Sequence, residues 1–98
     1  MRVLLTVEMD TEKTGKVIAD NRLAEVMRAA FDRLKPEAAY FTALDGLRTG
    51  LFVFDLRDTA DIPRLCEPLF QELGARINLT PAMDIDDVEA GMRRHAEA

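Results

Sequence analysis

Residues 37–56 read EAAYFTALDGLRTGLFVFDL, and this stretch decides the fold of the chain. It contains two apolar runs rich in aromatic residues, Ala38–Leu44 and Leu51–Leu56, separated by a segment that begins with Asp45-Gly46. Glycine accepts the positive φ that a tight turn requires, so Asp-Gly between two β-prone runs is a strong hairpin signal. The stretch therefore predicts two antiparallel strands joined by a turn.

The side chains of this hairpin should alternate between the two faces of a sheet. Regular alternation along the chain places Phe41 on one face with Val53, and places Tyr40 on the other face with Phe52 and Phe54. A one-residue bulge would exchange the two sets, because side chains in a strand have a period of two. The face predicted for each aromatic residue thus depends on the register of the strands.

Two further segments, Arg2–Met9 and Ala75–Met83, alternate apolar and other residues and are also predicted to be strands. Each carries β-branched residues on one face, which favours a strand that packs against a core. We expect helices to cover this face of the sheet. The residues predicted to lie on it are Val3, Leu5, Val7, Phe41, Val53, Ile77 and Leu79.

Helices are predicted where apolar residues recur every three to four positions. The segment Asp10–Gly15 is polar and is predicted to be a turn. The first helix follows it, with Asn21 as a point where it could break or restart. It ends near Leu34, because the residue before Pro36 avoids helical angles. A second helix ends at Gly74, where glycine can adopt the left-handed cap. A third, short helix lies close to the C-terminus.

The predicted order is strand, helix, strand, strand, helix, strand, and then an appended helix. This βαββαβ order is typical of the ferredoxin-like split motif, an α+β fold with helices on one face of a four-stranded antiparallel sheet. A chain of 98 residues has the size of one domain, which we assign to residues 1–98.

Composition and charge exclude several classes of function. The net charge is −5, and residues 51–98 carry ten acidic but only five basic side chains. We therefore expect no binding to nucleic acid or to anionic membranes, since both require clustered cations. A single cysteine fits a reducing compartment, and the N-terminal apolar run is too short for a membrane span or a signal-peptide core. The sequence predicts a cytoplasmic protein.

The sheet face opposite the helices is also predicted to be apolar. Three aromatic residues and two leucines on this face would expose about 400 Å², which is more than monomers usually tolerate. Burial of that area is a driving force of about 10 kcal/mol before the cost of association. A second copy of the chain is the expected partner. The five residues are Leu4, Tyr40, Leu44, Phe52 and Phe54.

The element order and the segments KPEAAYFT, DGLRTGLFVFDL and ADIPRLCEPLF resemble small bacterial proteins of the dimeric α/β-barrel superfamily. The resemblance covers nearly the whole chain and is one of pattern. It implies a homodimer whose sheets pair face to face, often around a cavity. The superfamily includes cofactor-independent monooxygenases of antibiotic biosynthesis, muconolactone-isomerase-like enzymes, haem-degrading and chlorite-dismutase-like proteins, and stress-responsive barrels.

The chain departs from the catalytic branches of that superfamily. It has no tryptophan, and its only histidine, His95, lies in the C-terminal tail, so the usual haem ligand is missing. We therefore expect no cofactor.

Polar residues predicted on the sheet face opposite the helices, called the open face below, form the candidate site. Glu8, Tyr40 and Asn78 would supply a carboxylate base, a phenol and an amide beside aromatic walls. The alternative is that they are polar residues of a dimer interface, where Tyr and Arg are common. The predicted ligand or dimer face comprises Glu8, Tyr40, Thr42, Phe52, Phe54, Arg76 and Asn78.

Two other groups are assigned no chemistry. The acidic cluster MDIDDVE, residues 83–89, lacks the glycine and the twelve-residue frame of a calcium-binding loop. Its carboxylates suit the first turn of a helix, which Asp84 or Asp86 would cap, so we predict no metal site. Cys66 lies on the apolar stripe of a helix beside Leu65 and Leu69, which predicts a buried, inert thiol.

Three functional hypotheses follow from the sequence. The first is a homodimer that binds a small apolar or aromatic molecule between its sheets. The second is a cofactor-independent monooxygenase or isomerase that acts on an aromatic or polyketide-like substrate. The third is a subunit or sensor domain that contacts another protein through its acidic second half.

Overall fold

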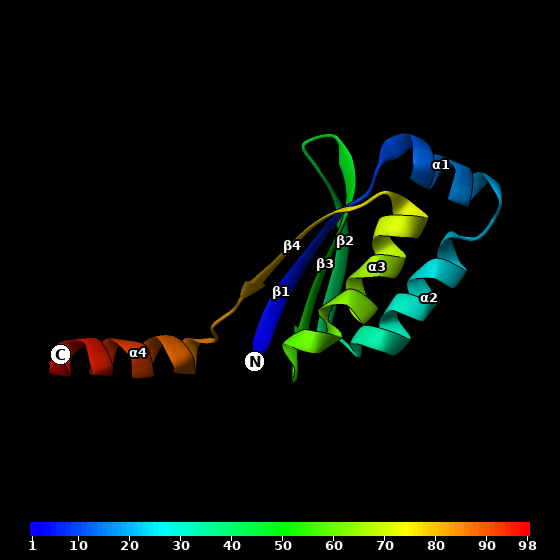
Figure 1. Cartoon of the computed structure of the whole chain (residues 1–98). Coiled ribbons are helices and arrows are strands. Elements are labelled where there is room, and N and C mark those ends of the chain that lie inside the picture. Colours follow the sequence, from blue (N-terminus) through cyan, green and yellow to red (C-terminus); the bar gives the residue numbers. More distant parts are fainter.

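The four predicted strands form one antiparallel sheet, with three helices on one face and a fourth helix that extends away from it (Figure 1). The computed structural model describes all 98 residues. In chain order the elements are β1 (Arg2–Glu8), α1 (Thr11–Ala19), α2 (Leu23–Leu34), β2 (Ala38–Leu44), β3 (Leu47–Asp55), a 3₁₀ turn (Thr59–Asp61), α3 (Ile62–Leu73), β4 (Arg76–Pro81) and α4 (Ile85–Glu97).

The strands lie in the order β2-β3-β1-β4, and every neighbouring pair is antiparallel. The predicted α+β class and four-stranded antiparallel sheet are confirmed. The sheet is open, and its arrangement with the covering helices is compatible with the ferredoxin-like fold.

The first helical segment begins earlier than predicted and is divided in two. Asp10 is the N-cap of α1, and its carboxylate accepts a hydrogen bond of 2.8 Å from the backbone N–H of Lys13. The prediction of a turn over Asp10–Gly15 was therefore wrong. The backbone φ of +57° at Asn21 separates α1 from α2, so the break falls at the residue that the sequence pointed to. Gly74, with φ of +56°, ends α3 as predicted.

The predicted hairpin is confirmed, with a turn of only two residues. Asp45 and Gly46 have φ values of +52° and +78°, as a type I′ turn requires, and Leu44 pairs directly with Leu47. Strand β3 therefore begins at Leu47, four residues before the predicted start.

The faces predicted for part of the hairpin were wrong. Residues that pair directly across antiparallel strands point to the same face, and Tyr40 pairs with Leu51. Phe52 and Phe54 consequently lie on the opposite face, beneath the helices, where they are 1% and 2% exposed. Val53, predicted beneath the helices, lies on the open face with Tyr40.

The reason is the length of the turn. Two turn residues between Leu44 and Leu47 make each odd-numbered residue of β2 face an even-numbered residue of β3. The prediction instead put even-numbered residues of β2 on the same face as even-numbered residues of β3. No bulge is involved, because the register is continuous from Ala38 to Leu44.

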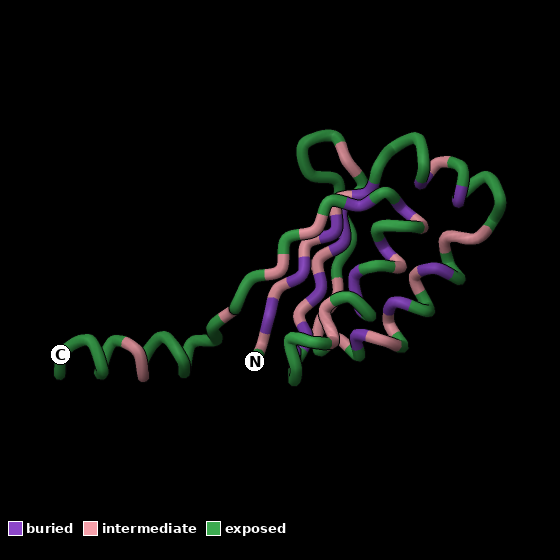
Figure 2. Tube along the Cα trace, in the orientation of Figure 1, coloured by how far each residue is buried: buried purple, intermediate pink, exposed green.

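The core fills the space between the sheet and helices α1–α3, as the buried segments in Figure 2 show. At its centre the ring of Phe52 meets two other rings nearly edge-on. The ring centroids lie 5.9 Å from Phe31 and 5.7 Å from Phe41. Gly50 makes room for this cluster, because a Cβ at this position would lie 2.8 Å from a ring carbon of Phe52.

We predict that Gly50→Ala lowers the free energy of unfolding by about 1–3 kcal/mol, the usual cost of overpacking a core. The ring of Phe52 cannot move aside because it is packed between Phe31 and Phe41. Urea denaturation measures the change. Gly15→Ala is the matched control, since nothing lies within 4 Å of its Cβ and alanine in α1 should add about 0.5–1 kcal/mol. Equal stability of the two variants would contradict the packing argument.

Helix α4 extends away from the sheet and helices, and none of its residues is buried (Figures 1 and 2). The chain measures 56 × 29 × 18 Å, and its radius of gyration is 15.8 Å. A compact chain of this length has a radius of about 13 Å. The excess reflects α4, which packs on no other element of the subunit. None of the helices has the length and apolar character needed to cross a membrane.

Candidate functional site: the open sheet face, α4 and an apolar groove

Most of the predicted site residues lie on the open face of the sheet, in two neighbouring rows that run across all four strands. The register defines the rows, since directly paired residues share a face. In strand order β2-β3-β1-β4 the rows are Tyr40, Leu51, Thr6, Asn78 and Thr42, Thr49, Glu8, Arg76.

The structure brings some of these side chains together and separates others. Glu8 pairs directly with Arg76 across β1 and β4, and Asn78 lies in the next row on the same edge. Tyr40 lies on the opposite edge strand, three strand spacings from Asn78, a distance of about 14 Å. The Tyr40 phenol and the Asn78 amide of one subunit are therefore too far apart to contact the same small substrate.

The open face remains apolar, although its composition differs from the prediction. Leu51 and Val53 take the places expected for Phe52 and Phe54. Tyr40 is 71% exposed. Sequence reasoning did not place these two aliphatic residues on the open face. Treating Asp45-Gly46 as a two-residue turn would have given the correct register and thereby placed them there. The apolar residues of this face are Leu4, Ala38, Tyr40, Leu44, Leu47, Leu51 and Val53.

A second uncovered apolar surface is the stripe of α4. Ile85, Val88 and Met92 are spaced to lie on one side of the helix, and Ile85 and Met92 are 68% and 61% exposed. Only the start of the helix is anchored to the body, where Arg2 Nη1 lies 3.1 Å from the carboxylate of Asp84. Because both ends of that pair are partly exposed, it orients α4 more than it stabilises the fold.

The acidic residues before α4 form a capping box. The Asp84 carboxylate accepts a 2.9 Å hydrogen bond from the N–H of Asp87, and the Asp87 carboxylate accepts one of 3.2 Å from the N–H of Asp84. The Asp87 backbone N–H, followed by Arg2, holds the pKa of Asp84 below its ordinary value. No group of three or more His, Cys, Asp or Glu side chains is arranged to hold a metal ion.

A largely apolar hollow lies on the helix side, where α2 meets the hairpin and the end of β1. Its volume is about 570 Å³, and its only charged residue is Arg48. Arg48 Nη1 donates a 3.3 Å hydrogen bond to the carbonyl of Thr11 and has no carboxylate partner. Thr42 is the one predicted site residue among its lining. The lining residues are Met9, Leu23, Ala24, Met27, Phe31, Phe41, Thr42, Arg48 and Thr49.

Sequence reasoning did not find this groove, because its walls come from segments distant in sequence that only the tertiary structure brings together. Glu8, Tyr40 and Asn78 line none of the larger cavities. The predicted placement of Cys66 is confirmed, since it is buried in α3. Burial, and to a smaller extent Glu67, raises the pKa of its thiol, which disfavours the reactive thiolate.

No protein-family model matches this chain, and no curated protein is similar to it in sequence.

We predict that the start of α4 loosens in acid. A folded-state pKa below the ordinary 3.8 of Asp84 means that the ionised form supports the helix. This contribution is complete above pH 3.8 and is lost as the pH falls through the lower, folded-state value. Amide hydrogen exchange of residues 85–90 over this range measures the loss.

The matched control compares two carboxylates of the same helical turn. Asp84→Ala should speed exchange at neutral pH, because it removes the cap. Asp86→Ala should have little effect, since Asp86 makes no capping bond. Equal acceleration by both variants would argue against a specific cap.

Proposed function

We propose that the chain is a homodimer of the dimeric α/β-barrel type, whose subunits meet through their open sheet faces, and that it binds a small apolar or aromatic molecule. The observation that carries the proposal is a pair of apolar surfaces, the open sheet face and the stripe of α4, that the subunit's own helices leave uncovered.

The areas support participation of both surfaces. Four strands at their usual spacing give a sheet face of about 450 Å². A stable interface buries about 800 Å² per partner, so paired sheets alone fall short. A helix of 13 residues is about 20 Å long, and docking its stripe on the partner adds about 200 Å² per subunit, which brings the area per partner to about 650 Å². The combined area reaches the range of a stable dimer.

The direction of α4 favours a second copy as its partner. The helix leaves the end of β4 and points away from its own sheet (Figure 1), so its stripe does not cover its own open face. If a second subunit packs its open sheet face against that of the first, it also supplies a surface on which the α4 of the first subunit can dock. The two uncovered surfaces of one chain are thereby matched by those of the other.

Tyr40→Asp tests the dimer. The side chain is 71% exposed on an edge strand, so the subunit should fold normally, while a carboxylate buried between apolar sheets is costly. We expect the wild type to have the mass of a dimer at micromolar concentration and the variant that of a monomer, measured by light scattering after gel filtration. Gln71→Asp, exposed on α3, is the control and should remain dimeric. A monomeric wild type would refute the proposal.

The groove between α2 and the hairpin supports the ligand part of the proposal. Its volume of about 570 Å³ lies within the range of small-molecule sites, and its walls are largely apolar and aromatic. Arg48 is its only charge and lacks a carboxylate partner. These features favour a ligand with an aromatic body and one carboxylate. We place this ligand in the groove between α2 and the hairpin, on the helix side of the sheet.

Two probes of similar shape test this assignment by calorimetric titration, naphthalene-2-carboxylate and the neutral 2-naphthol. Arg48→Gln should weaken the carboxylate about tenfold and leave naphthol unchanged, because only the charged contact is lost. Met27→Asp should abolish binding of both probes, since it puts a charge into the apolar wall. Lys16→Gln is the control of equal charge change and should match the wild type. Binding of both probes to Met27→Asp would contradict the site.

A second candidate function is a cofactor-independent monooxygenase or isomerase. The observation in its favour is that Glu8, Arg76 and Asn78 are neighbours on the open face. Tyr40 could join them only from the second subunit, because its own edge strand is too distant. Oxygen uptake with a dihydroxyaromatic substrate, abolished by Glu8→Gln, would favour the enzyme, whereas binding without turnover favours the ligand-binding dimer.

A further inference from the structure

The exposed large apolar side chains of the chain are concentrated on two elements, β2 and α4. Six of the ten lie there, three on each element. Those of α4 form the stripe described above, and those of β2 are Tyr40, Phe41 and Leu44. Each of these two elements therefore carries an apolar surface that lacks a partner within the subunit.

Strand β2 is an edge strand without the usual protection against pairing with other chains. Natural edge strands are shielded by charged side chains, by proline or by a bulge. The residues Ala38–Leu44 include no charge and no proline, and their register with β3 is continuous. The other edge strand, β4, carries Arg76 and ends at Pro81. Of the two edges of the sheet, β2 is thus the one that needs a cover.

The α4 of the same subunit does not provide this cover. Helix α4 follows β4, and β4 and β2 are the opposite edges of the sheet, three strand spacings or about 14 Å apart. From β4 the helix runs away from the sheet (Figure 1). One chain therefore contains both halves of an apolar contact that it cannot make with itself.

A second copy can complete the contact twice. A twofold axis that lies between two open faces and runs parallel to the strands sets the β4 edge of each subunit over the β2 edge of the other. This rotation keeps the ends of the strands at the same level. The row Ala38, Val53, Leu4, Thr80 shows that β4 ends at the level where β2 begins. The α4 of one subunit therefore starts beside the start of the other subunit's β2.

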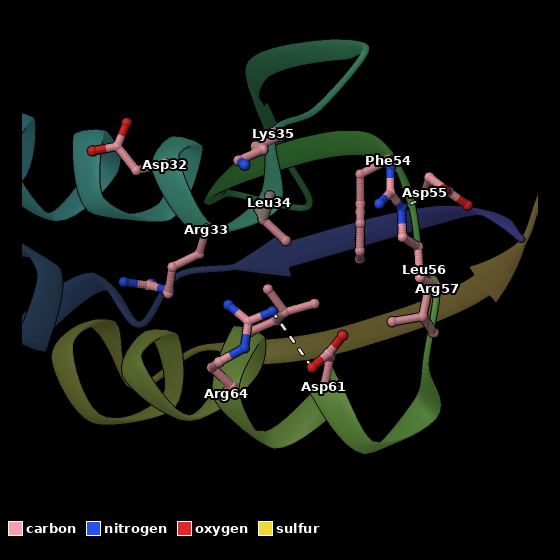
Figure 3. A pocket seen from close by; sticks show the side chains of 11 residues that line it. Asp32, Arg33, Leu34, Lys35, Phe54, Asp55, Leu56, Arg57, Asp61 and Arg64 are labelled. Carbon is pink, nitrogen blue, oxygen red and sulfur yellow. Dashed lines mark hydrogen bonds and ion pairs between the residues drawn. The ribbon is translucent and has the colours of Figure 1, made fainter.

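The charges at this level are complementary. Lys35 precedes β2, is exposed and forms no ion pair, and Figure 3 shows it at the end of α2, apart from the ion pair of Asp61 with Arg64. In the first half of α4, Asp86 and Glu89 also form no ion pair. Opposite charges at matching positions fix the orientation of two docked surfaces.

We propose that the α4 of each subunit docks its apolar stripe on the β2 edge of the other subunit, with its acidic start beside Lys35. This inference rests on the proposed homodimer, and it specifies the surface that receives α4. The two contacts are equal by symmetry, so the exchange closes at two subunits and does not extend into a filament.

A spin label on α4 tests the contact. Ala90→Cys places the label on the side of the helix opposite Met92, and the native Cys66 is buried and does not compete for the reagent. The labelled full chain is mixed with ¹⁵N-labelled wild type, so only contacts between subunits broaden the observed NMR signals. We expect broadening of the amides of residues 38–44. A dimeric mass without this broadening, or with broadening of α4 amides in its place, overturns the exchange and leaves the proposed dimer intact, whereas a monomeric mass refutes both.

Met92→Asp tests whether the stripe contributes to association. A carboxylate in the apolar contact should raise the dissociation constant of the dimer at least tenfold, measured by analytical ultracentrifugation. Ala90→Asp introduces the same residue on the opposite side of α4 and should leave the constant unchanged. Equal dissociation constants for the two variants would overturn the proposal.

Discussion

The two-residue turn at Asp45-Gly46 is the constraint on which the rest of the structure depends. Its positive φ values close the hairpin, and its length fixes which residue of β2 faces which residue of β3. That register sends Phe52 under the helices, where it joins Phe31 and Phe41 around the space left by Gly50. The same register leaves aliphatic and polar residues on the other face. A turn one residue longer would exchange the two sets and dismantle the core.

The structure divides its apolar residues between a closed core and two surfaces that remain uncovered. Helices α1–α3 cover most of one face of the sheet, whereas α4 begins with a capping box at Asp84 and then extends into solvent. A helix with good caps and no packing is poorly stabilised by itself, because most helix stability in proteins comes from burial of an apolar face. This imbalance is the physical basis for expecting a second subunit.

Local charge in this chain differs from its net charge. The acidic total argues against nucleic acid and anionic membranes, which require many cations over a broad surface. A single carboxylate requires only one cation at short range, and this can be supplied within an acidic protein. Arg48 beside the apolar groove is such a local arrangement. Salt screens the attraction between charges that lie farther apart than the Debye length, whereas a cation in contact with its anion is screened much less.

The sequence by itself determined the strand and helix order, the hairpin, the left-handed cap at Gly74 and the buried position of Cys66, because these depend on local chemistry and on periodicity. It also identified Glu8, Arg76 and Asn78 as residues of one sheet face. Only the tertiary structure decided the faces of Phe52, Phe54 and Val53, since one residue of loop length inverts every side chain beyond it. The apolar groove was likewise decided there, because it is built from segments distant in sequence whose contact no local pattern records.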